Sequence, residues 1–179
     1  MYPLIDNHGR TINYLRLAVT DRCNLRCFYC MPESGISYVP KPQLLTWEEM
    51  ERVVKLFVQM GISKVRITGG EPFVRRGIVE FLDKISRVDG LTQINITTNG
   101  VLTAPLIPTL KNLGIHSVNL SLDSIDRKRF FDITRRDEFG QVWQTFEALQ
   151  KYDIPTKINA VVMSGKNTQD IIPMIELTR

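Results

Sequence analysis

The feature that most constrains the fold is a regular alternation of short apolar segments with segments of helical periodicity. Apolar, β-prone runs predict five strands, over residues 12–19, 64–68, 93–98, 116–122 and 157–162. Segments with one apolar face predict helices over residues 46–60, 78–88, 106–113, 127–133 and 142–152, and from 168 onwards. Strands that alternate with helices predict right-handed crossovers and a parallel sheet. The expected fold class is therefore α/β, a partial TIM-type (β/α) barrel.

The length of 179 residues predicts a single domain, residues 1–179. The last predicted helix runs to the end of the sequence, with no further strands to close a barrel. We therefore expect a barrel that is incomplete at its C-terminal side, as a fragment or a shortened form would be. The first long helix carries its own start and stop signals, Thr46 with Glu49 as a capping box and Gly61 after the last turn.

All three cysteines lie in one short segment, as Cys23, Cys27 and Cys30 in a C-x3-C-x2-C pattern. An odd, clustered set argues against a disulfide framework and in favour of metal. Thiolates are the ligands of iron–sulfur clusters. Three of them can hold three irons of a 4Fe-4S cluster and leave the fourth iron open to a chelating ligand, such as the amino and carboxylate groups of S-adenosylmethionine (SAM).

Zinc is the main alternative for these cysteines, with a histidine as the fourth ligand. The sequence contains only His8 and His116, and neither has a zinc-finger spacing to the cysteines. A non-catalytic zinc module therefore remains the alternative from a different functional class.

Polar, glycine-rich residues follow the predicted strands. The cysteine segment follows the first strand, Gly69-Gly70-Glu71-Pro72 the second, Thr97-Thr98-Asn99-Gly100 the third and Ser121-Leu122-Asp123-Ser124 the fourth. The carboxyl ends of parallel strands meet at one edge, which carries the active site in barrel folds. We expect the two glycines to let a ligand approach the backbone, and Glu71 to accept from an ammonium group. Each segment alone could be a turn or a helix cap.

Charge and hydropathy narrow the class of partner. The formal net charge is +4, which fits an anionic small molecule. There is no dense Lys/Arg tract, so we expect no nucleic-acid binding. There is no apolar run long enough to span a bilayer and no signal-peptide pattern at the N-terminus, so we expect no membrane association and a cytoplasmic location.

Several motifs together make the chain resemble the radical SAM superfamily and, more closely, the GTP 3′,8-cyclases of molybdenum cofactor biosynthesis. The cysteine pattern and Gly-Gly-Glu-Pro are typical of the superfamily, and their surroundings are typical of the cyclases. The matching segments are Asp6–Arg10, Tyr14–Leu17, Thr20–Cys27, Tyr29–Pro32, Arg66–Pro72, Thr97–Gly100 and Asn119–Ser124.

The resemblance implies a radical SAM core with a 4Fe-4S cluster and SAM as cofactors. It implies a lyase that makes a 5′-deoxyadenosyl radical and cyclises GTP to 3′,8-cyclo-7,8-dihydro-GTP. The cluster ligands would be Cys23, Cys27 and Cys30, and the SAM contacts the Tyr29 backbone, Gly70 and Ser121. The GTP contacts would be Arg16, Arg66, Thr97 and Lys157. An electron donor is an implied partner, and the chain is a possible homodimer.

The predicted strand positions of the three cationic residues in this set also support binding of an anion. Arg16, Arg66 and Lys157 lie in predicted strands, where an inward charge is costly unless an anion such as a triphosphate pairs with it. The alternative is that they point into water or pair with a carboxylate such as Glu71 or Asp123, because side chains alternate along a strand.

One departure from the cyclase pattern bears on activity. The family carries a second three-cysteine cluster that helps to bind GTP, and a C-terminal Gly-Gly, whereas this chain has no cysteine after Cys30. We therefore expect the SAM half of the site to be intact and GTP turnover by this chain alone to be absent. A radical SAM enzyme that modifies peptides or sulfatases is the alternative within the superfamily.

Overall fold

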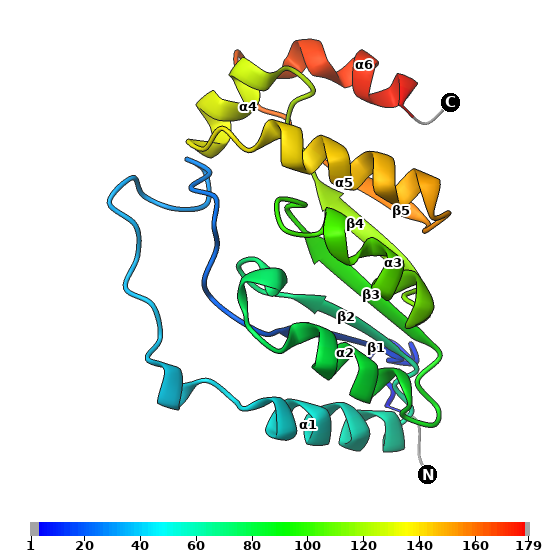
Figure 1. The fold of residues 1–179 in the computed structure, drawn as a ribbon. Helices are drawn as coiled ribbons and strands as arrows, with labels where there is room; N and C mark the ends of the chain where they lie inside the picture. The colour runs from blue at the N-terminus through cyan, green and yellow to red at the C-terminus, as the bar shows by residue number, and fades with distance from the viewer. Residues whose placement is uncertain (1–3, 178–179) are drawn as a thin grey trace.

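A computed structural model describes residues 4–177 of the chain (Figure 1). Its strands are β1 Tyr14–Ala18, β2 Lys64–Thr68, β3 Gln93–Thr98, β4 Ser117–Ser121 and β5 Thr156–Asn159. Its α-helices are α1 Trp47–Gln59, α2 Ile78–Ser86, α3 Ile107–Asn112, α4 Arg127–Thr134, α5 Phe139–Lys151 and α6 Ile171–Glu176. Short 3-10 helices are η1 Lys41–Gln43, η2 Pro72–Val74, η3 Ala104–Leu106 and η4 Thr168–Asp170.

The five strands form one parallel sheet in the order β1-β2-β3-β4-β5, as predicted. Neighbouring strands are in sequence order because each crossover returns the chain beside the strand it has just left. Within residues 4–177, β1 and β5 do not pair with each other, so the sheet is an open, partial barrel. None of the helices in this part of the chain is both long and apolar enough to cross a membrane.

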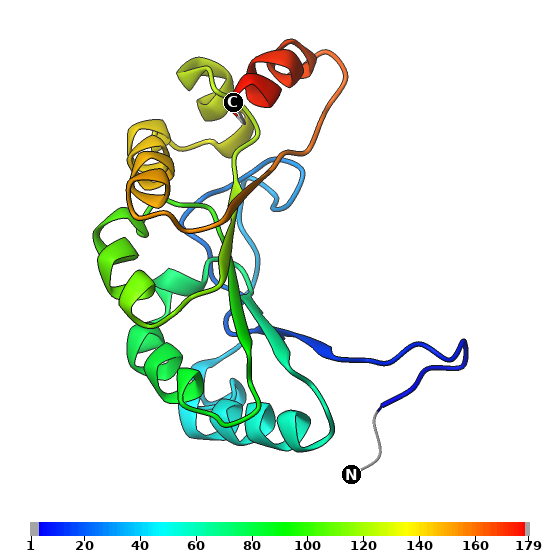
Figure 2. The ribbon, with the colours of Figure 1, turned by 90° about the vertical axis from the view of Figure 1, so that its right-hand side faces the viewer.

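Helices α1, α2, α3 and α5 cover one face of the sheet, and Figure 2 shows them on the same side of it. The strand side chains that face these helices are apolar and buried, among them Val65, Ile67, Ile96, Val118 and Leu120, all 0% exposed. They pack against helix residues such as Val54, Leu82, Leu110 and Leu149. The hydrophobic core therefore lies between the sheet and these four helices, and the opposite face of the sheet carries the polar strand residues.

Several boundaries differ from the sequence prediction by one to three residues, and the end of β5 and the start of α5 each differ by three. The fifth strand ends at Asn159, not at residue 162, although Val161 and Val162 are strand-prone. The Val161 amide donates to the Asp123 carboxylate, and the Val161 carbonyl accepts from the Asn167 side chain. Both backbone groups of Val161 are therefore bonded to side chains and not to a neighbouring strand. Helix α5 begins at Phe139, three residues before the predicted start.

The predicted capping box of α1 is confirmed, with Thr46 and Glu49 bonded reciprocally.

Candidate functional site

The cysteine loop leaves the carboxyl end of β1 and carries three free thiols. Cys23 and Cys27 are half-buried and Cys30 is exposed. The Cys27 carbonyl accepts from the amides of both Cys30 and Met31 at 2.9 Å, which turns the chain between the second and third thiols. The loop is also bonded to the end of α4, because Arg26 N donates to Thr134 O at 2.9 Å.

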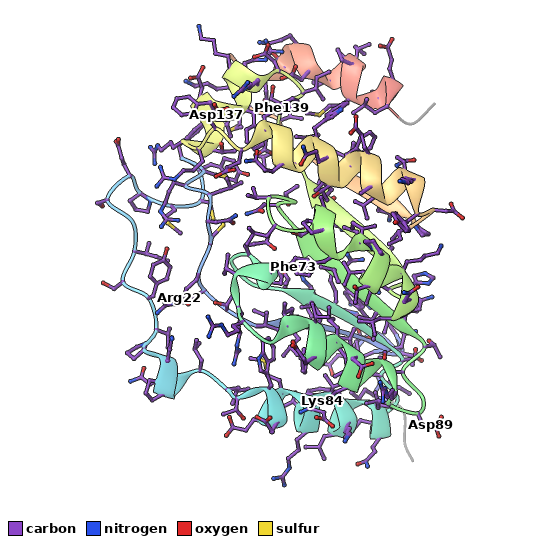
Figure 3. All side chains as sticks on the ribbon, viewed as in Figure 1. Arg22, Phe73, Lys84, Asp89, Asp137 and Phe139 are labelled. Carbon is purple, nitrogen blue, oxygen red and sulfur yellow. The ribbon has the colours of Figure 1, made fainter. Side chains whose placement is uncertain are left out.

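The glycine pair after β2 packs against the start of this loop. Gly70 N donates to Thr20 O at 2.6 Å, and Glu71 N donates to Arg22 O at 2.7 Å. A Cβ atom at Gly69 or Gly70 would lie closer than 3.0 Å to backbone atoms of Thr20 or Arg22. Gly69 also has a φ of +148°, which side chains disfavour. In the structure the close approach that the glycines permit is therefore to the backbone of the cysteine loop. Figure 3 labels Arg22 in this loop and Phe73 just beyond β2.

Glu71 points into the protein, which differs from the expectation that it faces a ligand ammonium. It is 1% exposed. Its Oε1 accepts from Phe73 N at 3.1 Å and the Thr98 hydroxyl at 2.8 Å, and its Oε2 accepts from Asn99 N at 2.6 Å. Burial raises the pKa of Glu71 to about 7, against the lowering effect of these hydrogen bonds. Glu71 thus joins the end of β2 to the end of β3.

Asn99 at the end of β3 contacts the cysteine loop. Its Nδ2 lies 3.6 Å from Cys23 Sγ and donates to Asn24 Oδ1 at 2.7 Å. The sequence placed Asn99 at the correct edge but gave no sign of this contact, since the two segments are far apart along the chain. Asn99 therefore fixes the side of the loop that carries the first thiol.

The thiols of Cys23 and Cys27 have raised pKa values. Burial raises the pKa of Cys27 to about 11, with a smaller contribution from the negative charge of Asp123. Burial likewise raises the pKa of Cys23. Metal binding would release these protons, because only the thiolate is a ligand.

The donor set fits an iron–sulfur cluster. Among residues 4–177, no group of three or more His, Cys, Asp and Glu side chains is gathered closely enough to hold a single metal ion. A 4Fe-4S cluster instead takes one thiolate on each of several irons. Three unpaired thiols on one loop supply that chemistry.

The three residues predicted to contact SAM follow or end strands β1, β2 and β4 at the carboxyl edge of the sheet. Tyr29 is in the loop, Gly70 follows β2, and Ser121 ends β4. The Tyr29 hydroxyl donates to Asp123 Oδ2 at 2.6 Å, which brings the loop to the end of β4. Burial and this hydrogen bond raise the pKa of Tyr29 above its usual value.

The four residues predicted to contact GTP lie on the face of the sheet that the helices leave uncovered. Arg16 pairs in register with Arg66, and Lys157 lies in register with Asn119, which in turn pairs with Thr97. Arg66 alternates with buried Val65 and Ile67, so it points away from the helices. The structure therefore brings the four positions to one polar face.

These cations are not neutralised by carboxylates. Within the described residues no ion pair involves Arg16, Arg66 or Lys157. Arg66 donates instead to the Tyr14 hydroxyl at 2.7 Å. Of the two carboxylates weighed as partners, Glu71 and Asp123 are both bonded to other donors. The face is thus electropositive and suited to an anion.

Known proteins are similar in sequence to this chain. The family model described as the radical SAM superfamily matches residues 17–178. The chain is 45% identical to a GTP 3′,8-cyclase of Desulforamulus reducens, over 98% of this chain and 54% of that protein. It is 40% identical to the molybdenum cofactor biosynthesis protein moc-5 of Caenorhabditis elegans, over 99% of this chain and 30% of that protein. The chain thus spans about half the length, or less, of these relatives.

Solved structures share the fold. Streptococcus suis SuiB bound to S-adenosylmethionine superposes with a TM-score of 0.73 at 21% identity, over 92% of this chain and 35% of that one. Native anSMEcpe with bound AdoMet superposes with a TM-score of 0.71 at 19% identity, over 92% of this chain and 49% of that one. The three-cysteine loop at the carboxyl edge of an open parallel sheet and the match over residues 17–178 lead to one conclusion: the chain belongs to the radical SAM superfamily, whose members use a 4Fe-4S cluster and SAM.

Proposed function

We propose that this chain carries the SAM-cleaving part of a GTP 3′,8-cyclase, a lyase of molybdenum cofactor biosynthesis. The observation that carries the proposal is the placement of two features of the structure next to each other. A loop with three free thiols lies at the carboxyl edge of the sheet, and the uncovered face beside it presents Arg16, Arg66 and Lys157. The similarity to proteins named GTP 3′,8-cyclase supports GTP as the substrate.

In this proposal Cys23, Cys27 and Cys30 hold the cluster. When bound, the cluster and SAM supply one-electron chemistry that yields an organic radical able to abstract hydrogen from the substrate. The chain itself orients the reactants. The Tyr29 backbone, Gly70 and Ser121 would contact SAM, and their positions at the carboxyl edge of the sheet support this assignment.

The substrate lies on the uncovered face, with its phosphates towards the cations. Arg suits phosphate geometry through bidentate hydrogen bonds, and Arg16 and Arg66 lie side by side in register. Lys157 and Thr97 flank Asn119 on the β5 side of the same face. Strand residues make a rigid platform, so the substrate is held at a fixed distance from the loop.

One partner follows from the chemistry. An electron donor has to supply the electron for SAM cleavage, and we expect it to approach the exposed side of the loop near Cys30. The proposal also includes a homodimer, and a measurement of the oligomeric state in solution tests it.

Anaerobic reconstitution with iron and sulfide tests the cluster. We expect about four irons per chain, a spectrum that changes when SAM is added, and release of 5′-deoxyadenosine on reduction. C27S should lose SAM cleavage. A protein that binds stoichiometric zinc and no iron–sulfur centre, or a centre that ignores SAM, would contradict the proposal.

Binding of GTP to the reconstituted protein tests the substrate. K157A should weaken GTP binding about tenfold, the size expected for loss of a charge-assisted contact. K151A is the matched control, because Lys151 ends α5 on the helix layer of the protein. Equal effects of the two variants, or tighter binding of a peptide substrate than of GTP, would argue for a different radical SAM enzyme.

A further inference from the structure

Asp123, two residues beyond β4, joins three segments that are far apart in the sequence. Its Oδ2 accepts from the Tyr29 hydroxyl at 2.6 Å, and its Oδ1 accepts from Val161 N at 2.8 Å. Its backbone carbonyl accepts from Asn167 Nδ2 at 2.6 Å. Asp123 is buried, so these bonds are shielded from water. One side chain therefore ties the cysteine loop to the segments that follow β4 and β5.

Tyr29 is the loop residue that makes this connection, and it lies between the second and third thiols. The Tyr29 residue is 43% exposed, so burial alone does not fix its side chain. Because the hydroxyl donates to an ionisable carboxylate, its bond to Asp123 is of the short, strong kind. The hydroxyl thus anchors the Cys27–Cys30 segment to the end of β4, while Phe28 N in the same segment donates to Ile133 O of α4 at 3.0 Å.

We infer that Asp123 is a positioning residue for the cluster and SAM site, and that it acts through the Tyr29 hydroxyl. It holds the segment that carries Cys27 and Cys30 against the end of β4, where Ser121 lies. A loop that is already ordered does not have to be ordered when its ligands bind, which favours binding. The inference rests on the proposed function for the identity of those ligands, but the anchoring itself is a property of the metal-free chain.

The first test therefore uses the metal-free protein. Timed alkylation with iodoacetamide, followed by peptide mapping, gives a rate for each cysteine. Y29F removes only the hydroxyl, and Y38F is the matched control, because the Tyr38 hydroxyl has only a weak contact at 4.0 Å to the Met31 sulfur. We expect Y29F to raise the alkylation rate of Cys27 about tenfold, the effect of losing a charge-assisted hydrogen bond on a local opening equilibrium. Y38F should leave the rate unchanged.

D123N completes a double-mutant cycle. If Asp123 acts through the Tyr29 hydroxyl, the Y29F/D123N variant should react no faster than the faster single variant. Additive effects, or an alkylation rate of Cys27 in Y29F equal to that of the parent, would overturn the inference. Thermal unfolding of each variant separates local loosening of the loop from global loss of stability.

The second test uses the reconstituted protein and a readout that a general structural role would not move. Y29F should keep the iron content of the parent but need about tenfold more SAM to reach half of the spectral change, while Y38F should match the parent. An unchanged SAM requirement in Y29F would also overturn the inference. If the parent assembles no iron–sulfur centre, the proposed function fails, whereas the alkylation rates still decide whether Asp123 positions the loop.

Discussion

Glu71 offers the sharpest quantitative prediction, because it is a buried carboxylate with three defined donors. We consider E71Q, which keeps the shape of the side chain and removes its charge. Protonated Glu71 can donate from Oε1 to the Thr98 hydroxyl, which in turn can donate to Thr103 at 3.0 Å. Glutamine can do the same through its NH₂ group, but it then leaves Phe73 N without an acceptor. E71Q should therefore cost about 1–2 kcal/mol at low pH.

The pH dependence follows from the raised pKa of Glu71, about 7 against 4.5 in the unfolded chain. Between these values the folded state binds the proton and the unfolded state does not. Stability is therefore highest below pH 4.5 and falls as the pH rises towards 7. At about 1.4 kcal/mol for each unit of pKa, the loss amounts to about 3 kcal/mol. E71Q carries no such proton, so it should become as stable as the parent, or more stable, at pH 8.

Urea unfolding of the metal-free parent and of E71Q at pH 5, 6, 7 and 8 measures this effect, because the difference between the two proteins cancels all other titrations. The sign of the difference should reverse across this range. E80Q, on the exposed side of α2, is the control and should track the parent at every pH. A stability difference between E71Q and the parent that stays constant from pH 5 to pH 8 would refute the reasoning.

Three further predictions concern stability. G70A should cost about 3 kcal/mol in urea unfolding, because its Cβ would overlap Arg22 backbone atoms, whereas G140A has open space in α5 and should be neutral or stabilising. D170N should lower the unfolding free energy by about 2 kcal/mol, because Asp170 is 2% exposed and pairs with Arg129. D137N, which breaks an exposed pair with Arg127, should leave it unchanged. T46A should cost about 1 kcal/mol by removing the α1 cap, and equal stability to the parent would contradict that role.

The fold was predictable because local patterns carry it. The alternation of apolar strands with amphipathic helices gives the order of the elements, and right-handed crossovers then leave little choice of topology. The end of β5 was not predictable in this way. Val161 and Val162 are strand-prone, but the Val161 amide is taken by Asp123, which lies 38 residues away in the sequence. A long-range side-chain acceptor overrode a local preference.

By itself, the sequence determined which residues could do the chemistry. The spacing of Cys23, Cys27 and Cys30 already specifies a three-thiolate loop, because their separation is fixed by the chain. Only the tertiary structure decided how the surrounding residues are used. Glu71 faces the interior, and Asp123 reaches back to Tyr29 across 94 residues. Such contacts form because strand ends that are far apart in the sequence meet at one edge of the sheet. A local pattern of residues does not show which distant residue will lie beside it.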